Sequence, residues 1–111
     1  MIGGNTEAIV QIKLTDKNEI GETEETWLNH DSLLGWLDLS NGDSSSTYNA
    51  KIQESTHLFI CDYKSLSFTS ENARFLIDGH VYEIKLIDDP MGMHQHLEIY
   101  LKYIGGGLGV R

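Results

Sequence analysis

Hydrophobic and polar residues alternate along two stretches near the C-terminal end of the chain. In the first, Tyr82, Ile84 and Leu86 alternate with charged residues, and the same period returns from Leu97 to Tyr103. A period of two places the apolar side chains on one face of a strand, whereas a helix repeats about every 3.6 residues. Both stretches are therefore predicted to be half-buried β-strands.

The residues around the first stretch are typical of turns. Asp78 and Gly79 precede it, and an Asp-Gly pair supplies the positive φ angles of a two-residue hairpin turn. This predicts a hairpin between 75–77 and 80–87. The Asp-Pro pair at 89–90 ends the strand, because proline lacks an N–H donor and restricts the residue before it.

The rest of the chain is also predicted to be mostly strand. Three runs alternate or are largely apolar, at 7–14, 33–39 and 57–63, and 23–28 returns from a turn as a further strand. Only in 64–72 do we expect a short helix or 3₁₀ turn. The chain is therefore predicted to be all-β, a small antiparallel β-barrel of about six or seven strands.

Two of these runs carry further signals. Glutamates crowd 23–28, which predicts an exposed edge, because charge discourages unwanted strand pairing. The run 33–39 is apolar on both faces around Trp36, which predicts a central strand or one at a contact. Gly35 within it indicates a bulge or a barrel corner. The predicted core comprises Val10, Ile12, Leu37, Phe59, Ile77, Tyr82, Ile84, Leu97, Ile99 and Leu101.

A long polar segment separates the runs 33–39 and 57–63. Its first half favours turns and solvation, and loops of this length in small domains are functional or disordered. It is either a mobile surface loop or a segment that orders on assembly, and the sequence leaves both open. The segment comprises Ser40, Asn41, Gly42, Asp43, Ser44, Ser45, Ser46, Thr47, Tyr48, Asn49, Ala50, Lys51, Ile52, Gln53, Glu54 and Ser55.

Composition and charge narrow the function. The 111 residues are predicted to form one domain, 1–104, followed by a flexible Gly-rich tail, 105–111. With 8 basic and 17 acidic residues the formal charge is −9, the opposite of what a protein that grips phosphates carries. A single cysteine, no membrane-length apolar run and no signal-peptide pattern favour a cytoplasmic protein.

The candidate catalytic and metal-binding patterns are weak. His94 and His96 have HxH spacing, but zinc sites need three or four matched ligands and no third nitrogen or sulfur ligand is nearby. The triplet at 30–32 holds the residue types of a Ser-His-Asp triad, yet triads assemble from separate segments, so a turn with a capping side chain is the better interpretation. Cys61 lies in an apolar strand and is predicted to be a small buried hydrophobe. No catalytic residue, cofactor or metal is expected.

The order of several short motifs resembles a known family. They are Trp27 shortly after the first hairpin, Thr56-His57 before the fourth predicted strand, an Asp-Gly-x-x-Tyr-x-Ile turn at Asp78, Gly79, Tyr82 and Ile84, and the acidic connector Asp88-Asp89-Pro90 before a final alternating strand. Each motif alone is ordinary hairpin sequence, but together and in order they span nearly the whole chain. The sequence resembles the small head–tail connector proteins of tailed phages and of phage-like prophage elements in Gram-positive bacteria. It is most similar to those encoded just after the major capsid protein in defective prophages of bacilli.

The resemblance implies a structural role. Such proteins are small β-barrels that form a ring beneath the portal after DNA packaging and join head to tail. Head-closure members (stoppers) also keep DNA from leaking. The implied partners are a portal or adaptor ring, tail-completion proteins and further copies of the chain, with packaged DNA nearby but no sequence-specific binding and no membrane. The implied location is the host bacterial cytoplasm during assembly and the virion neck afterwards.

In stopper-like relatives a long loop points into the channel, and by position that loop corresponds to Ser40–Ser55. Its Ser- and Asn-rich sequence departs from a DNA-binding pattern, so channel closure by it would be steric. The alternative is a monomeric β-barrel module that binds a peptide or small ligand in a preformed pocket. A ring component instead needs two different complementary surfaces. An enzyme built around the two histidines ranks third.

Overall fold

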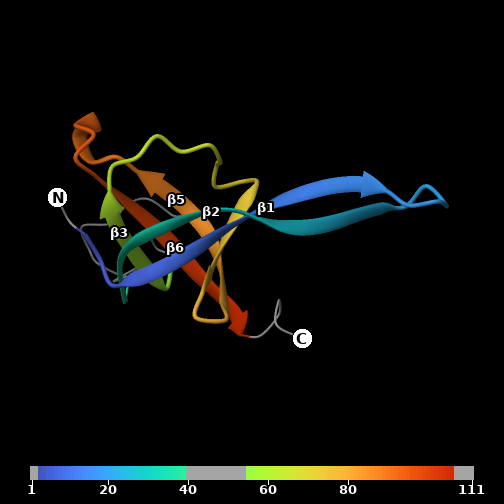
Figure 1. The fold of residues 1–111 in the computed structure, drawn as a ribbon, viewed down its shortest axis with the longest axis horizontal. Helices are drawn as coiled ribbons and strands as arrows, with labels where there is room; N and C mark the ends of the chain where they lie inside the picture. Colours follow the sequence, from blue (N-terminus) through green and yellow to red (C-terminus); the bar gives the residue numbers. More distant parts are fainter. Residues whose placement is uncertain (1–2, 40–54, 107–111) are drawn as a thin grey trace.

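The structure is a computed structural model and describes residues 3–39 and 55–106. Within these ranges six antiparallel strands form a closed barrel in the order β1-β2-β3-β6-β5-β4, with β4 returning to β1 (Figure 1). The all-β fold predicted from alternation is confirmed. The elements are β1 (Thr6–Lys17), β2 (Thr23–Leu39), β3 (His57–Asp62), β4 (Ala73–Ile77), β5 (His80–Asp88), the 3₁₀ turn η1 (Pro90–Gly92) and β6 (His96–Gly106).

Inward side chains of all six strands fill the barrel. Phe59 and Phe75 lie fully buried at its centre, edge to face with ring centroids 5.5 Å apart, a favoured geometry for aromatic pairs. All ten residues predicted for the core belong to it or pack against it, with Ile12 and Leu37 only partly buried. The predicted turn is also confirmed, because Asp78 and Gly79 have φ angles of 53° and 80° between β4 and β5.

In the first half of the barrel, the strand boundaries differ from those predicted. The sequence indicated separate strands at 23–28 and 33–39 with a turn at 30–32, but β2 is one continuous strand. Val10 pairs with Asp31 and Gln11 with Asn29, which leaves His30 as the extra residue of a β-bulge. A bulge interrupts side-chain alternation without ending the pairing. Its polar residues therefore resemble a turn in the sequence.

Because of a second bulge, the last residues of β5 face the opposite way from the prediction. The register of β5 against β6 shifts between Ile84 and Leu86, which makes Lys85 the extra residue. One added residue moves the following side chains to the opposite face. Ile87, and not the predicted Leu86, therefore packs against the core.

Gly35 marks a close approach and not a bulge. It lies opposite Cys61 of β3 with no shift in register. A Cβ atom here would lie 2.4 Å from the carbonyl oxygen of Ile60 and 2.8 Å from Cζ of Phe59. Glycine is needed because the β3 backbone at Ile60 and the Phe59 ring both lie directly against the β2 backbone.

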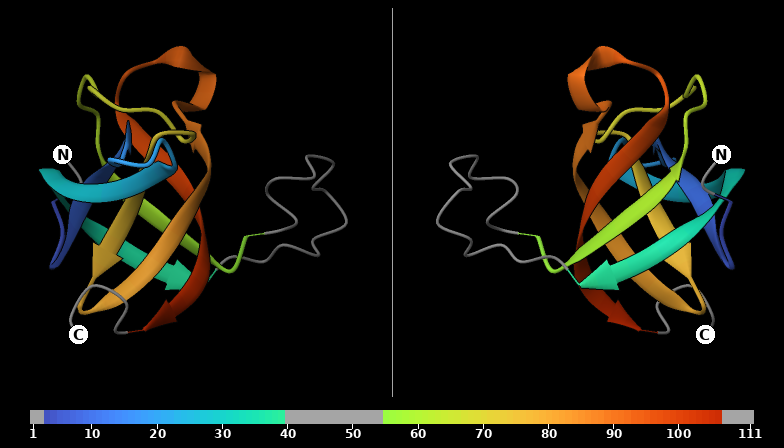
Figure 2. Two further views of the ribbon diagram at one scale, coloured as in Figure 1. Left: turned by 90° about the vertical axis from the view of Figure 1, so that its right-hand side faces the viewer. Right: turned by 90° about the vertical axis from the view of Figure 1, so that its left-hand side faces the viewer.

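The segment after β3 contains no helix, contrary to the prediction for 64–72. Asn72 Oδ1 accepts the N–H of Thr69, and this bond closes a turn. Phe68 from this segment is buried with its ring 6.4 Å from that of Phe75. The segment therefore covers one end of the barrel (Figure 2).

The predicted boundary between domain and tail also moves. β6 continues through the start of the Gly-rich run, with Gly105 opposite Val81 and Gly106 opposite His80. The barrel thus includes the first two residues that were assigned to the tail. Residues 107–111 lie outside the described part of the chain.

The hairpin of β1 and β2 is longer than the barrel is deep. β1 pairs with β4 only over Ile9–Ile12, and β2 pairs with β3 only over Gly35–Leu39. Beyond the barrel, residues 14–26 form a two-stranded projection, which we call the arm (Figure 1). The arm accounts for the elongated shape of 49 × 29 × 27 Å. The prediction of an exposed edge at 23–28 is confirmed.

Candidate functional site

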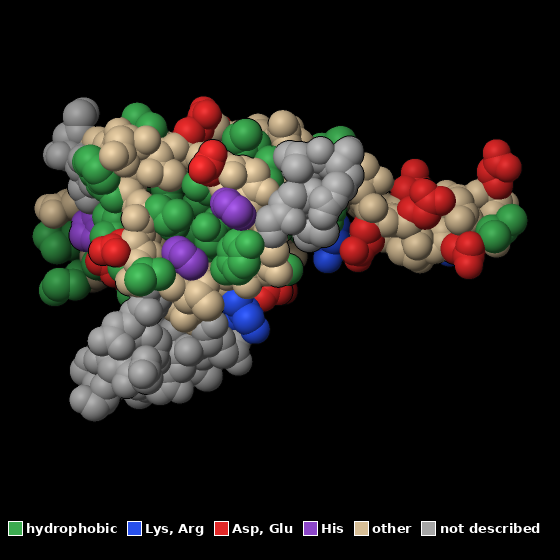
Figure 3. Space-filling model, turned by 90° about the horizontal axis from the view of Figure 1, so that it is seen from below, with side chains coloured by type: hydrophobic (Ala, Val, Ile, Leu, Met, Phe, Trp, Pro, Cys, Tyr) green, Lys and Arg blue, Asp and Glu red, His purple; other side chains and the backbone are tan. Residues whose placement is uncertain are grey.

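The arm is acidic along its length and apolar at its tip (Figure 3). Ile20 is 77% exposed, and Leu14 is 45% exposed nearer the barrel. The arm holds five carboxylates against one cation, Lys17, a formal charge of −4. The carboxylates belong to Asp16, Glu19, Glu22, Glu24 and Glu25.

A single side chain organises the tip. Asn18 Oδ1 accepts the backbone N–H groups of Ile20 at 3.1 Å and Glu22 at 2.9 Å. Gly21 completes the turn with a φ angle of 86°. Sequence reasoning assigned these residues to an ordinary turn and missed Ile20. The sequence signal is that Ile20 is an isolated apolar residue among polar turn residues, at a position that does not belong to an alternating, core-facing strand.

A polar network and a small cavity lie where the arm meets the barrel. The Arg74 guanidinium sits 4.2 Å from the centroid of the Trp27 ring. Arg74 Nε donates to Gln11 Oε1 at 2.8 Å, and Gln11 Nε2 donates to Asn29 Oδ1 at 2.9 Å. Burial lowers the pKa of Arg74. These contacts hold β4 against the base of the β1–β2 hairpin.

The cavity beside this network, which we call the base cavity, has a volume of about 170 Å³. Trp27, Ala73 and Ile104 form its apolar lining. Its charged lining is mixed and comprises Lys13, Arg74, Glu71 and Glu83.

A larger cleft of about 550 Å³ lies at the barrel end that carries the β4–β5 turn. Leu37, Ile77 and Tyr82 form its apolar lining, and Glu7 and His80 are among its polar residues.

Aromatic rings surround this end of the barrel. Tyr82 and Tyr103 meet at 5.6 Å, and His57 lies edge-on to Tyr82 at 5.1 Å. Burial lowers the pKa of His57 and, as the largest cause, raises the pKa of Tyr82. Both groups are therefore held toward their neutral forms.

Of the candidate segment Ser40–Ser55, residues 40–54 lie outside the described part of the chain. Ser55 is buried, and the next residue is fixed to β6. The Thr56 backbone N–H donates to the Leu101 carbonyl at 2.8 Å, and the Tyr103 N–H donates to Thr56 Oγ1 at 2.7 Å. The Thr-His pair singled out in the sequence thus joins this segment to the barrel.

The two histidines of the HxH pattern contact different carboxylates. His94 Nδ1 pairs with Asp89, whose other oxygen accepts the His94 backbone N–H at 3.0 Å, and the His94 ring stacks on Tyr63 at 4.4 Å. His96 Nε2 lies 3.1 Å from Glu98 Oε2. In 3–39 and 55–106, no group of three or more His, Cys, Asp or Glu side chains is placed to hold a metal ion.

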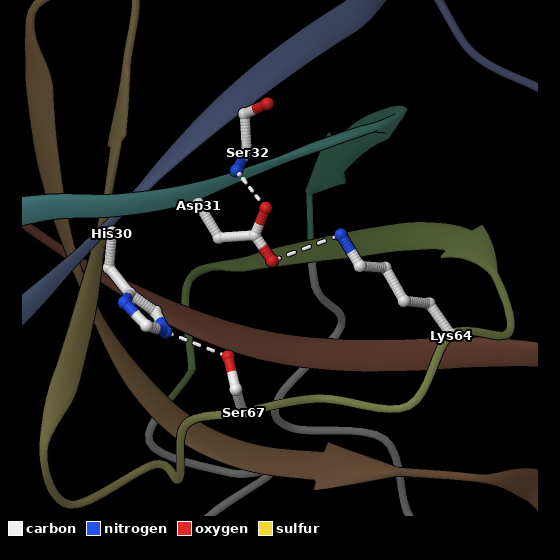
Figure 4. Close-up of polar contacts among 5 residues, drawn as sticks. All are labelled: His30, Asp31, Ser32, Lys64 and Ser67. Carbon is white, nitrogen blue, oxygen red and sulfur yellow. Dashed lines mark hydrogen bonds and ion pairs between the residues drawn. The ribbon is translucent and has the colours of Figure 1, made fainter.

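The triplet at 30–32 tethers β2 to the segment after β3 (Figure 4). Asp31 Oδ2 pairs with Lys64 Nζ at 3.0 Å, whereas His30 Nε2 contacts Ser67 Oγ at 2.7 Å. The hydrogen bond from Lys64 is the largest cause of a lowered pKa at Asp31. The histidine and the aspartate thus have separate partners, and a triad would need them joined.

Cys61 is buried, as predicted. Burial raises the pKa of its thiol to about 11. Only the thiolate is an effective nucleophile, so this side chain acts as a packing residue.

No protein-family model matches the chain, and no curated protein matches it with significance. No helix in the described ranges is long and apolar enough to cross a membrane.

Proposed function

We propose that this chain is a structural subunit of a phage neck, which joins head to tail in a ring beneath the portal and helps to close the DNA channel. The observation that carries the proposal is the arm, an acidic projection with an apolar tip on a closed barrel. A projection of this kind suits contact with another protein better than it suits the enclosure of a substrate. The ordered motifs that resemble head–tail connectors supply the particular assembly.

The charge of the chain supports the same role. A ring of subunits that each carry −9 repels DNA along its channel, so that translocating DNA does not adhere. The partners in this proposal are a portal or adaptor ring, tail-completion proteins and other copies of the chain. In this proposal the chain is made in the host cytoplasm and becomes part of the virion neck.

Two experiments test the proposal. Native mass spectrometry of the chain mixed with a portal-type protein from the same genome should give a ring-sized complex that the chain alone does not form. Removal of the gene from an inducible prophage should leave DNA-free or tailless particles, and expression in trans should restore complete ones. Normal particles without the gene would contradict the proposal.

The 550 Å³ cleft favours a second candidate, a binding module for a peptide or small ligand. Its volume lies within the range of about 300–1,000 Å³ that is typical of ligand sites. His80 lines the cleft from an exposed position, so His80→Trp should narrow it without disturbing the core. A neck protein should tolerate this change in the particle assay, whereas a ligand-binding module should lose ligand-induced thermal stabilisation.

A further inference from the structure

The tip of the arm presents an apolar side chain, Ile20, that the residues described in 3–39 and 55–106 leave exposed. Among the large hydrophobic side chains in the described ranges, only Met91 is more exposed than Ile20. Glu19 and Glu22 flank Ile20 in the turn. An apolar residue held out from the body of a protein on an ordered turn is suited to contact with a partner.

The base cavity is complementary to the arm tip, because it combines an apolar lining with nearby cations. Trp27, Ala73 and Ile104 give it an apolar lining of a size suited to one aliphatic side chain. Four of the five Lys and Arg residues described outside the arm lie at or beside it. Lys13 and Arg74 line the cavity. Lys85 forms an ion pair with Glu83, which also lines the cavity, and Lys102 lies opposite Glu83 in the β5–β6 pairing. Glu71 and Glu83 also line the cavity, and Lys13 and Lys85 pair with Glu25 and Glu83, so Arg74 and Lys102 are the cations that an incoming carboxylate would meet.

We propose that the arm tip of one copy docks into the base cavity of a second copy, with Ile20 between Trp27 and Ile104 and the arm carboxylates beside Arg74 and Lys102. The tip cannot fill its own cavity, because six strand residues at about 3.3 Å each hold it roughly 20 Å beyond the barrel. An arm tip in this cavity must therefore belong to another molecule, and charge complementarity favours the tip of a second copy.

This inference deepens the proposed function. The tip and the cavity are different surfaces, so the contact is heterologous, and repetition of a heterologous contact produces a ring when the rotation closes. Each subunit would give its arm to one neighbour and receive the arm of the other. The repeated contact would thus define the direction of the ring.

The small area that this contact buries predicts a weak association between isolated chains. One hairpin tip in one cavity buries much less than the roughly 800 Å² per partner of a stable complex. The isolated chain is therefore largely monomeric, and the contact persists when many copies are held together, because each then acts at high effective concentration. The net charge of −9 also opposes self-association of the isolated chain.

Cysteine cross-linking tests the contact directly. Chains that carry Ile20→Cys and a mass tag are mixed with untagged chains that carry Ile104→Cys and treated with a short bis-maleimide. Native Cys61 is buried, so the unmodified chain should not react. We expect mixed dimers in excess of control dimers by on the order of tenfold, as a specific contact raises the local thiol concentration.

Met91→Cys provides the matched control, because this position is 91% exposed and lies in η1, away from the arm. Equal yields for the pairs 20–104 and 20–91 would overturn the proposal, as would a dominant 20–20 product. Loss of the specific product at about 1 M salt, where the screening length is about 3 Å, would support the charge complementarity. A product that does not respond to salt would contradict that part of the proposal.

A charge exchange completes the test. Glu19→Lys in the tip-bearing chain should lower the 20–104 yield, and Lys102→Glu in the cavity-bearing chain should restore it. Failure of the second change to restore the yield would place the arm elsewhere. Failure of this contact can be distinguished from failure of the proposed function. If the chain completes particles but the cross-link does not form, the neck function stands and the arm–cavity contact is wrong.

Discussion

The barrel and the arm are built from the same two strands but are stabilised differently. Ile12 and Leu14 lie two residues apart on one face of β1, yet Ile12 packs against the core and Leu14 is 45% exposed. The difference comes from the neighbouring strands. At Ile12, β1 has β4 on its second edge, whereas at Leu14 it has only β2. Alternation therefore predicts which face a side chain takes, and the number of strands around it decides whether it is buried.

Polar contacts repeat the contrast. In the barrel wall, Gln11 is buried and hydrogen-bonded to both Arg74 and Asn29. Where the arm joins the barrel, Lys13 Nζ lies 3.7 Å from Glu25 Oε2, with the Lys13 side chain partly exposed and the Glu25 side chain exposed. Pairs of this kind contribute at most about 1 kcal/mol. The arm therefore depends on its β1–β2 backbone pairing and its turn more than on this ion pair.

Truncation of an apolar side chain should separate the two regions most strongly. Phe59→Ala removes a fully buried ring and should lower the free energy of unfolding by about 3–5 kcal/mol. Leu14→Ala on the arm should cost less than about 1 kcal/mol, since this side chain is already half exposed. Urea unfolding at neutral pH measures both. Similar costs for the two variants would show that the arm belongs to the cooperative core.

The two turn glycines provide a smaller contrast. Gly79 and Gly21 have φ angles of 80° and 86°, so valine is strained at either position. Gly79→Val should cost about 1–3 kcal/mol, because its hairpin belongs to the barrel wall. Gly21→Val should cost less in global unfolding, because the end of the arm can open locally. Thermal melts of the two variants compare them, and a larger shift for Gly21→Val would contradict this account.

The pH dependence should arise in the barrel, because residues 14–26 contain no histidine. Burial lowers the pKa of His57 in the folded chain. As the pH falls below about 6.5, the unfolded chain takes up this proton first, so this contribution to stability is complete at neutral pH and is lost below that value. Stability should therefore fall less between pH 7 and pH 5 in His57→Phe than in the unmodified chain. Equal slopes in urea unfolding would remove His57 as a cause.

The sequence predicted faces and turns well, and its errors cluster where pairing is irregular. Asp78-Gly79 and the inward residues of β6 follow local rules and were predicted correctly. His30 and Lys85 are bulge residues, and a bulge depends on the partner strand, which alternation along one strand does not contain. The burial of Phe68 likewise depends on where a loop crosses the barrel end.

The candidate site was less predictable for a similar reason. The polar segment Ser40–Ser55 has an evident sequence signal, but 40–54 lie outside the described residues. Ile20 has almost no signal within a turn. Its significance depends on the length of β1 and β2 relative to their neighbours, which is a property of the closed barrel.

The most direct test of the central claim removes the arm. Leu14 and Thr26 are cross-strand partners, so replacement of residues 15–25 by Asn-Gly retains the register and closes a two-residue turn. The measurement is the number of DNA-filled, tail-bearing particles that this variant restores to a prophage lacking the gene, with a thermal melt as control. We expect a melting temperature within a few degrees of the unmodified protein, together with few or no complete particles. Complete particles at normal numbers would contradict the assembly role of the arm, and a collapsed melt would show that the arm is part of the fold.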